Sequence, residues 1–195
     1  MLTEADYLTK WLDYDIDLKT NTMYLGSNDY NKDGEETGTD FKMAKSVIKN
    51  LHILKEKDYT IRIIMNNLGG DIYHALAIYD AIQLLTHNEV RITCYGYCMS
   101  AGSIILQAAD IRAMAPNAVM MLHYGTYAYE GHTPTGISAT EETKRLDKWM
   151  ENLYLSVINN VKPKFTKRKL RELLTNDWYL PAYMAEEYGL IDKVM

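Results

Sequence analysis

The sequence predicts an α/β protein built around a mostly parallel β-sheet. Apolar, β-branched runs such as 60–66 and 89–95 alternate with segments in which apolar residues recur at helical spacing. Strands and helices that alternate in this way are typical of right-handed βαβ units, which place successive strands parallel to one another. The 195 residues contain no internal repeat and suit a single domain over 1–195, long enough to bury a core.

The elements of the first two thirds follow from two periodicities. Short apolar runs predict strands, whereas apolar residues three or four positions apart predict helices. Thr39 or Asp40 is expected to cap the first long helix. The expected elements, in chain order, are a peripheral N-terminal arm over 1–21, a strand over 22–25, a polar loop over 27–40, a helix over 39–55, a strand over 60–66, a helix over 72–85, a strand over 89–95, a short helix from Ser100 to about Ala109 and a strand over 118–123.

The last third leaves the βαβ pattern and predicts a projecting region over about 124–160. A loop over 124–137, rich in Gly, Thr and Tyr, precedes a helix predicted over 138–160. Such a helix would be about 35 Å long, which is more than a core of this size needs. We therefore expect its apolar stripe to pack against the same helix of another subunit. The stripe consists of Leu146, Trp149, Met150, Leu153 and Val157. A helix over 166–175 and a closing segment complete the chain.

Composition and charge argue against several functions. The net charge of −5 and the pI of about 5.5 provide no basic stripe to neutralise phosphates, so nucleic acid is not expected as the main partner. No apolar run is long enough to span a membrane, and the acidic N-terminus does not resemble a signal peptide. Cys94 and Cys98, the only cysteines, are interpreted as buried thiols in a reducing cytoplasm. Tyrosine is unusually common, with 16 residues against 2 phenylalanines, and the sequence assigns these side chains no function.

Two short stretches carry the chemistry. In IIMNNLGGD, residues 63–71, an apolar run breaks into a glycine pair whose backbone N–H groups can point at a developing negative charge. In YGYCMSAGSIILQAAD, residues 95–110, a turn of small residues delivers Ser100 to the start of an apolar helix. Hydrolysis of an acyl bond needs both an oxyanion site and an activated nucleophile. The pair of motifs therefore predicts acyl transfer to Ser100.

Four motifs in register resemble the proteolytic subunit of the Clp protease, the ClpP family of serine peptidases. IRIIMNNLGGDIYHALAIYDAI is similar to the family's strand, its Asn-Ser-Pro-Gly-Gly turn and the following helix. GYCMSAGSIILQAAD resembles the Gly-x-Ala-x-Ser-Met-Gly nucleophile motif, RAMAPNAVMMLHYG the Arg-x-x-x-Pro-Asn…Met-x-His-Gln-Pro segment, and AEEYGLIDKV the closing motif. The match runs from about Ile61 to Asp192. It implies the ClpP/crotonase fold, a repeated βαβ spiral with a projecting handle helix, in a divergent family member.

Carried over position by position, the resemblance implies that Ser100 is the nucleophile and His123 its general base. A helix N-terminus at Ser100 would favour negative charge, and His123 at the end of a buried strand could shuttle a proton near neutral pH. The N–H of Gly70, or of its neighbour Gly69, would hold the oxyanion together with that of Ala101. The alternative interpretation makes His123 a half-buried structural histidine and the glycine pair a simple tight turn.

The third catalytic residue, the carboxylate that orients the histidine, departs from the family pattern. Counted back from AEEYGLID, the family's catalytic aspartate falls on Leu173, which cannot orient an imidazole. Glu172 and Asp177 are the nearby carboxylates. We predict that Asp177 reaches His123 from a shifted loop, the alternative being an impaired triad. The segment after His123 departs as well, because Gly125 replaces the family's proline and TYAYEGHTPTG replaces its glycine-rich strand.

The resemblance predicts a serine endopeptidase that hydrolyses peptide bonds of unfolded polypeptides inside a ring-shaped homo-oligomer, a tetradecamer first and a single heptamer second. It also implies a cytoplasmic location and a Clp-type ATPase as partner. Two alternatives stay open: a catalytically weak or inactive ClpP-like structural subunit of a mixed assembly, and a crotonase relative that acts on acyl-CoA thioesters. A compact chain with divergent termini would also suit a phage-encoded member.

No metal site and no cofactor are expected. The histidines other than His123 show no ligand-like spacing with cysteine or carboxylate. They are His52, His74, His87 and His132.

Overall fold

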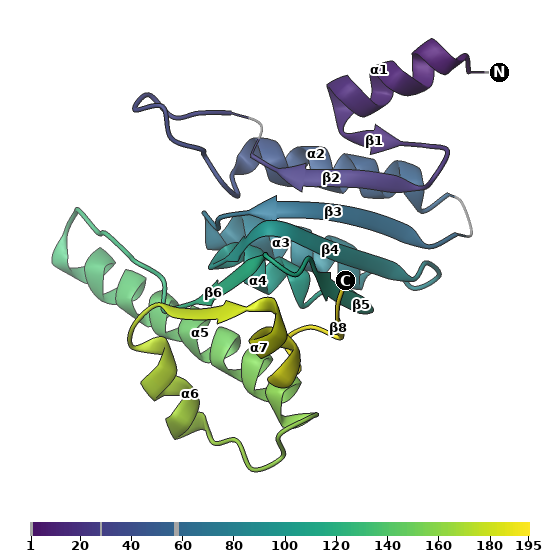
Figure 1. Cartoon of the computed structure of the whole chain (residues 1–195). Coiled ribbons are helices and arrows are strands. Elements are labelled where there is room, and N and C mark those ends of the chain that lie inside the picture. Colours follow the sequence, from purple (N-terminus) through teal and green to yellow (C-terminus); the bar gives the residue numbers. More distant parts are fainter. Residues whose placement is uncertain (1, 28, 57–58) are drawn as a thin grey trace.

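A twisted, mostly parallel sheet forms the frame of the molecule (Figure 1). The computed structural model describes residues 2–27, 29–56 and 59–195, so Met1 of the expected arm and Asn28 of the expected loop lie outside the described residues. The strands run in the order β1-β2-β3-β4-β5-β8, with β6 paired to β4 and β7 paired to β6. Their bounds are β1 (Ile16–Asp17), β2 (Thr22–Gly26), β3 (Ile61–Asn67), β4 (Val90–Met99), β5 (Ile111–Met114), β6 (Val119–Leu122), β7 (Trp178–Pro181) and β8 (Lys193–Val194).

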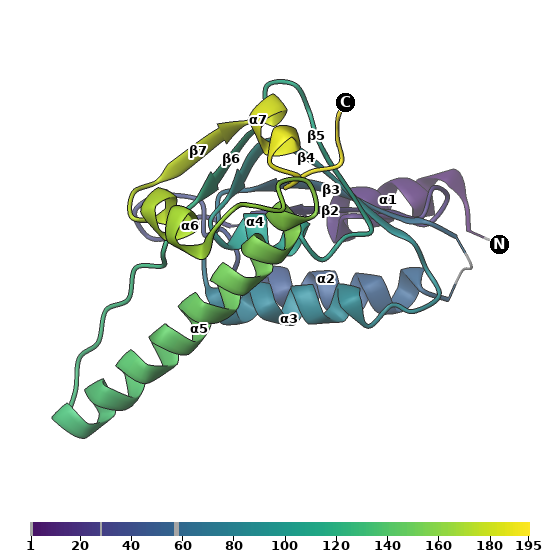
Figure 2. The ribbon, with the colours of Figure 1, turned by 90° about the horizontal axis from the view of Figure 1, so that it is seen from below.

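Helices α2 and α3 lie side by side on one face of the sheet, and α5 extends away from the body of the molecule (Figure 2). The chain leaves β6, runs outward as an extended segment, and returns as α5. The helices are α1 (Glu4–Tyr14), α2 (Phe41–Leu54), α3 (Ile72–Gln83), α4 (Ala101–Leu106), α5 (Thr133–Asn159), α6 (Lys167–Leu174) and α7 (Ala182–Glu187). The predicted α/β class with parallel βαβ units is confirmed, because β2, β3, β4 and β5 pair in parallel.

Strand β4 pairs with β3 on one side and with two different strands on the other. Its first half, from Arg91 to Cys94, pairs with β5, and its second half, from Tyr97 to Met99, pairs with β6. The predicted strand over 89–95 covers only the first half, because the glycine and small residues that follow look like a turn in the sequence. The second half matters most for function, because it leads directly into Ser100.

The core confirms the helical pattern that the sequence predicts for α2. Its buried face consists of Met43, Ala44, Val47, Asn50, Leu51 and Leu54. Of the two candidate caps, Asp40 is the one used, since its side chain accepts a hydrogen bond from the Met43 N–H at 2.8 Å.

The thiols of Cys94 and Cys98 are both buried, and burial raises the pKa of Cys98.

The sequence-based prediction misses the two-residue strands β1 and β8 and the longer strands β5 and β7. Strand β5 is a short run over Ile111–Met114, between the Ser100 helix and β6. Strand β7, over Trp178–Pro181, pairs antiparallel with β6 and ends in a proline. Its first residue, Trp178, follows Asp177 directly, so the segment predicted to be a loop carries the candidate aspartate at the beginning of a strand.

Helix α5 corrects two expectations. It begins at Thr133 and not near Ser138, because Pro134 occupies its first turn, where a proline is well tolerated. The apolar stripe expected to pack on another subunit lies largely against its own chain. Leu146 and Met150 are buried, and Trp149 stacks edge-on against Tyr79 of α3 at 5.4 Å between ring centroids.

The outer part of α5 behaves differently from its inner part. From Thr133 to Arg145 the helix has no buried residue, whereas Leu146, Met150, Glu151, Tyr154 and Ile158 are buried closer to the body. The N-terminal arm is likewise peripheral, since α1 contains no buried residue. Among the described residues, no helix combines the length and apolar character needed to cross a membrane.

Candidate active site

Strand register brings the three predicted catalytic residues to one edge of the sheet. Parallel strands β4 and β6 end together, with Met99 opposite Met121, so the residues that follow them, Ser100 and His123, emerge side by side. Antiparallel β7 lies on the other side of β6 and begins opposite its end, with Trp178 opposite Leu122. The residue before β7, Asp177, therefore arrives next to His123.

Ser100 is held in an unusual backbone conformation at the junction of β4 and α4. Its φ of 48° and ψ of −122° lie in a region that residues with a side chain rarely adopt. The Ser100 N–H donates to the Met121 carbonyl at 2.8 Å, which anchors the turn to β6. A strained strand-to-helix turn of this kind presents the serine hydroxyl outward, as the nucleophile elbow of α/β-hydrolases does.

The side chains of Ser100, His123 and Asp177 form a row in which each lies within hydrogen-bond distance of the next. His123 Nε2 lies 2.8 Å from Ser100 Oγ, and His123 Nδ1 lies 3.2 Å from Asp177 Oδ1. A neutral imidazole with its proton on Nδ1 satisfies both contacts, because Nδ1 then donates to the carboxylate and Nε2 accepts from the hydroxyl. The side chain of His123 is 25% exposed and that of Asp177 is 52% exposed.

The two competing positions for the third residue both lie on α6, away from this row. Leu173 packs against the core. Glu172 is exposed, and its carboxylate oxygens lie 3.9 Å from Arg168 and Lys169 of its own helix. The structure thus brings Asp177, and neither Leu173 nor Glu172, into contact with His123.

The three N–H groups considered for the oxyanion hole, those of Gly69, Gly70 and Ala101, differ in whether they are already bonded. The Gly69 N–H donates to Asn67 Oδ1 at 2.7 Å and is therefore in use. None of the hydrogen bonds within the described part of the chain involves the N–H of Gly70 or of Ala101. Gly69 and Gly70 have φ values of 107° and 138°, and a Cβ on Gly69 would lie 2.7 Å from Ser100 Cβ. Only glycine allows the turn to approach the serine this closely.

A buried Asn67–Thr39 pair supports the glycine turn. Besides accepting from Gly69, the fully buried Asn67 donates from Nδ2 to Thr39 Oγ1 at 2.9 Å. The backbone of Thr39 also holds the glycine turn on both sides, because its N–H donates to the Gly69 carbonyl and its carbonyl accepts from the Asp71 N–H. The sequence does not reveal this pair, because Thr39 lies 28 positions from Asn67 and its local pattern marks it only as a possible helix cap.

Helix α5 supports the serine turn from the other side. The buried Ser103 hydroxyl donates to the Ser100 carbonyl at 2.6 Å, and the Tyr154 hydroxyl lies 2.6 Å from Ser103 Oγ. Burial raises the pKa of Tyr154, so its hydroxyl stays protonated and able to donate. The serine turn is therefore anchored to α5 through two buried hydroxyls.

A second polar cluster fixes the base of α5 beside the site. The buried Glu151 carboxylate accepts hydrogen bonds from Arg171 at 2.8 Å and from Tyr124, the neighbour of His123, at 2.6 Å, and pairs with Lys167 at 2.8 Å. Burial alone would raise the pKa of Glu151, but these partners outweigh it and lower the pKa to about 2. Burial and the adjacent Glu151 carboxylate raise the pKa of Tyr124 to about 12.

The candidate site opens into a pocket of about 370 Å³. Ser100, Ala101, His123 and Gly70 line one part of it, and Asp71 and residues from α3, α4, α5 and the segment after β6 line the rest. Within the described residues, no group of three or more His, Cys, Asp or Glu side chains is arranged to hold a metal ion.

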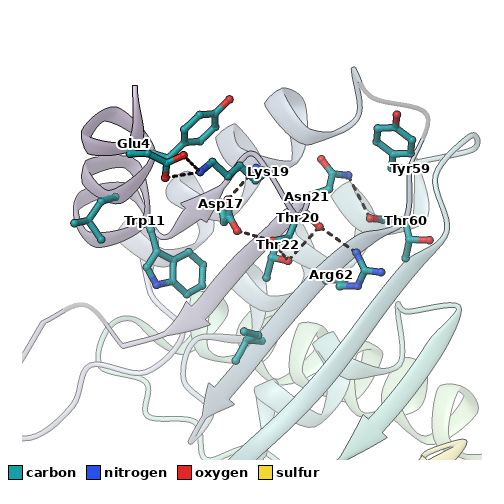
Figure 3. A pocket seen from close by; sticks show the side chains of 13 residues that line it. Glu4, Trp11, Asp17, Lys19, Thr20, Asn21, Thr22, Tyr59, Thr60 and Arg62 are labelled. Carbon is teal, nitrogen blue, oxygen red and sulfur yellow. Dashed lines mark hydrogen bonds and ion pairs between the residues drawn. The ribbon is translucent and has the colours of Figure 1, made fainter. Parts of the chain in front are cut away.

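A larger pocket, of about 1020 Å³, lies elsewhere in the molecule, beneath α1 (Figure 3). Most of its polar side chains are bonded to one another or to nearby backbone, whereas the buried Asn21 Oδ1 has no hydrogen-bond partner among the described residues. Lys19 pairs with Glu4 at 2.6 Å, and Arg62 donates to the Thr20 carbonyl at 3.1 Å. The described residues that line this pocket include no serine, cysteine or histidine, so they offer no nucleophile comparable to Ser100.

Comparison with solved structures defines the fold class. A ClpP1 variant from Listeria monocytogenes superposes with a TM-score of 0.76 over 96% of this chain and 95% of that one, at 22% sequence identity. The predicted ClpP-like fold is therefore confirmed.

Sequence comparison establishes the family. A model of the Clp protease family matches residues 36–195, and the chain therefore belongs to that family, with a Clp-type peptidase domain. The ATP-dependent Clp protease proteolytic subunit of Deinococcus radiodurans is 29% identical over 163 residues, which cover 82% of this chain and 77% of the relative. The ATP-dependent Clp protease proteolytic subunit 2 of Pseudomonas aeruginosa is 30% identical over 161 residues, which cover 81% and 77%.

Proposed function

We propose that this chain is a serine endopeptidase that hydrolyses peptide bonds of unfolded polypeptides. The observation that carries the proposal is the unbroken row of contacts from Asp177 through His123 to Ser100, at 3.2 and 2.8 Å. A serine hydroxyl is a weak nucleophile until a neighbouring base takes its proton, and the base works best when a third group orients it. Membership of the Clp protease family supports the same activity.

The first half of the reaction transfers the acyl group to the enzyme. Ser100 Oγ attacks the scissile carbonyl carbon while His123 Nε2 takes the hydroxyl proton. The negative charge that develops on the carbonyl oxygen is stabilised by the free N–H groups of Gly70 and Ala101. The Asp177 carboxylate stabilises the imidazolium that forms. The imidazolium then gives its proton to the leaving amine as the carbon–nitrogen bond breaks, which leaves an ester on Ser100.

The second half returns the enzyme to its starting state. His123 Nε2 takes a proton from a water molecule, whose oxygen attacks the ester carbonyl. The same two N–H groups stabilise the second oxyanion. Collapse releases the carboxylic acid and returns the proton to Ser100 Oγ.

One feature of the site favours a second candidate, a weak or inactive subunit with a structural role in a mixed assembly. Asp177, the carboxylate beside His123, is 52% exposed. Solvent screens an exposed carboxylate, so Asp177 would stabilise the imidazolium less than a buried aspartate does. The two candidates differ in whether Ser100 reacts.

Labelling with a fluorophosphonate probe separates the candidates, because the probe reacts covalently with activated serines. We expect stoichiometric labelling of the wild-type chain and none of Ser100→Ala. Peptide hydrolysis should also fall to background in Ser100→Ala and in His123→Ala, since without a base the hydroxyl stays un-ionised at neutral pH. Absence of labelling in folded, assembled wild-type protein would favour the structural role.

The proposal includes assembly into a ring-shaped homo-oligomer in the cytoplasm, a tetradecamer first and a heptamer second, which receives polypeptides from a Clp-type ATPase. The outer part of α5 supports assembly. Residues 133–145 extend from the body with no buried side chain, and Ile137 there is 58% exposed. A long exposed helix with apolar residues gains stability when another subunit covers it.

Light scattering of the purified chain tests the assembly. We expect a mass that is a multiple of 22.5 kDa, near fourteen or seven copies. A stable monomer at micromolar concentration would contradict the assembly without bearing on the chemistry of Ser100.

A further inference from the structure

The pocket beside Ser100 has an uneven charge distribution. Two carboxylates line it, Asp71 and Asp147, and among the described residues that line it there is no lysine or arginine. Asp71 is already engaged, because its Oδ1 caps α3 by accepting from the N–H groups of Tyr73 and His74 at 2.8 and 3.1 Å. Asp147 is the carboxylate left to interact with a ligand.

Asp147 lies on the inner part of α5, between Leu146 and Lys148, and is partly buried. Within the described part of the chain, no hydrogen bond or ion pair includes its carboxylate. Burial and the nearby Glu151 raise the pKa of Asp147, which means that its surroundings leave the negative charge uncompensated. Lys144 and Lys148 line a neighbouring pocket together with Asp147, but neither lies within 4 Å ion-pair distance of it.

Two tyrosines stand on the same pocket. Tyr73 from α3 and Tyr127 from the segment after β6 line it and are 52% and 44% exposed. The pocket continues along α5 into a second hollow, which Tyr73 and Tyr127 share with Tyr129. Aromatic rings beside an unpaired carboxylate form a favourable environment for an ammonium or guanidinium group, through cation–π attraction and charge pairing.

We infer that this pocket selects a lysine or arginine side chain on the residue that supplies the scissile carbonyl, with Asp147 as its charge partner and Tyr73 and Tyr127 as its walls. The inference rests on the proposed function, because it assigns specificity to the same site. The position of the side chain follows from the geometry. The carbonyl must meet Ser100 Oγ and the N–H groups of Gly70 and Ala101, and these line the same pocket as Asp147.

The experiment measures kcat/KM for fluorogenic peptides that differ only in this residue, which is lysine, arginine, leucine or glutamate. Active sites are counted first with the fluorophosphonate probe. We expect lysine and arginine peptides to be cleaved at least about tenfold faster than leucine and about a hundredfold faster than glutamate. Asp147→Asn should reduce the ratio of lysine to leucine cleavage by about tenfold.

Glu141→Gln is the matched control, because Glu141 lies on the same helix, is exposed, and does not line the pocket. It should leave the ratio unchanged. A wild-type protein that labels and cleaves but prefers leucine would overturn the inference and leave the proposed function standing. So would an Asp147→Asn variant whose ratio equals that of the wild type. A protein that neither labels nor cleaves any peptide would overturn both.

Discussion

Two hollows of this molecule differ in how their polar groups are used. Beneath α1, most polar groups that line the larger one bond to each other or to backbone, such as Lys19 with Glu4 and Arg62 with the Thr20 carbonyl, and Asn21 Oδ1 is a buried atom without a partner among the described residues. Beside Ser100, the smaller one contains a strained serine, two free backbone N–H groups and an unpaired carboxylate on Asp147. We call these the α1 pocket and the Ser100 pocket.

Size is therefore a poor guide to chemistry in this molecule. A polar group that already has its hydrogen-bond partners gains little free energy when a ligand binds. An unsatisfied or strained group gains more, because the ligand supplies the missing partner. The Ser100 pocket is smaller but holds such groups where three strands meet. We accordingly expect single substitutions to have large effects around the Ser100 pocket and small effects around the α1 pocket.

Asp177→Asn should give the largest change among the residues that support the nucleophile. An amide at this position favours the wrong imidazole tautomer and removes the charge that stabilises the imidazolium, so we expect kcat to fall by about 10² to 10⁴. Stability should change little, because Asp177 is half exposed and caps no helix. Steady-state kinetics and thermal unfolding measure the two effects.

Glu172→Gln is the control for that change, since Glu172 is exposed on α6 and pairs with its own helix instead of His123. It should leave kcat unaltered. A large loss in Glu172→Gln with none in Asp177→Asn would show that the wrong acid is assigned. No loss in either would show that the enzyme works as a Ser–His dyad.

Asn67→Ala should lower kcat about tenfold or more with a smaller effect on KM. The change removes the acceptor of the Gly69 N–H, so the glycine turn no longer holds the Gly70 N–H in a fixed position. The Gly70 N–H stabilises the oxyanion of the transition state and not the bound substrate, so its displacement lowers kcat more than it changes KM. Asn67→Ala should also cost about 1 to 3 kcal/mol of stability. Thr39→Val keeps the backbone hydrogen bonds of Thr39 with Gly69 and Asp71 and removes only the hydroxyl. It should therefore lower kcat less than Asn67→Ala does. If both variants lose stability but keep the kcat of the wild type, the pair is purely structural.

Glu151 provides a prediction about pH. Because its pKa falls from the ordinary 4.5 to about 2 in the folded chain, its ionised form contributes up to about 3 kcal/mol of stability. A lowered pKa means that this contribution is complete above pH 4.5 and is lost as the pH falls from 4.5 toward 2. Denaturant unfolding across that range should show the loss in the wild type and a flatter profile in Glu151→Gln. An identical pH dependence in both would refute the assignment.

Lys19→Ala should have the smallest effect and tests the α1 pocket. It removes the Lys19–Glu4 pair, whose side chains are 43% and 90% exposed. Exposed pairs of this kind contribute little, so we expect peptide hydrolysis to stay unchanged and the melting temperature to shift by no more than about 2 °C. A clear loss of peptide hydrolysis would show that the α1 pocket is coupled to Ser100.

Local patterns in the sequence are enough to predict the frame of this protein and part of its candidate site. Alternating periodicities predict the parallel βαβ frame, and the helix predicted over 39–55 agrees with α2 to within two residues at each end. The glycine pair and the serine turn are also local, because positive φ and a strand-to-helix junction are encoded within a few residues. For this reason Ser100 and the glycine turn are recognisable as candidates from the sequence.

How distant segments meet depends on the tertiary structure. Asp177 reaches His123 because antiparallel β7 begins where β6 ends, and no periodicity in a strand of four residues reveals that pairing. Thr39 contacts Asn67, which lies 28 positions away in the sequence, and local sequence patterns do not predict this contact either. The stripe on α5 has the same pattern whether it packs on its own domain or on another subunit. Hydrophobic periodicity records that a face is buried but not what covers it, since burial of apolar surface is non-directional.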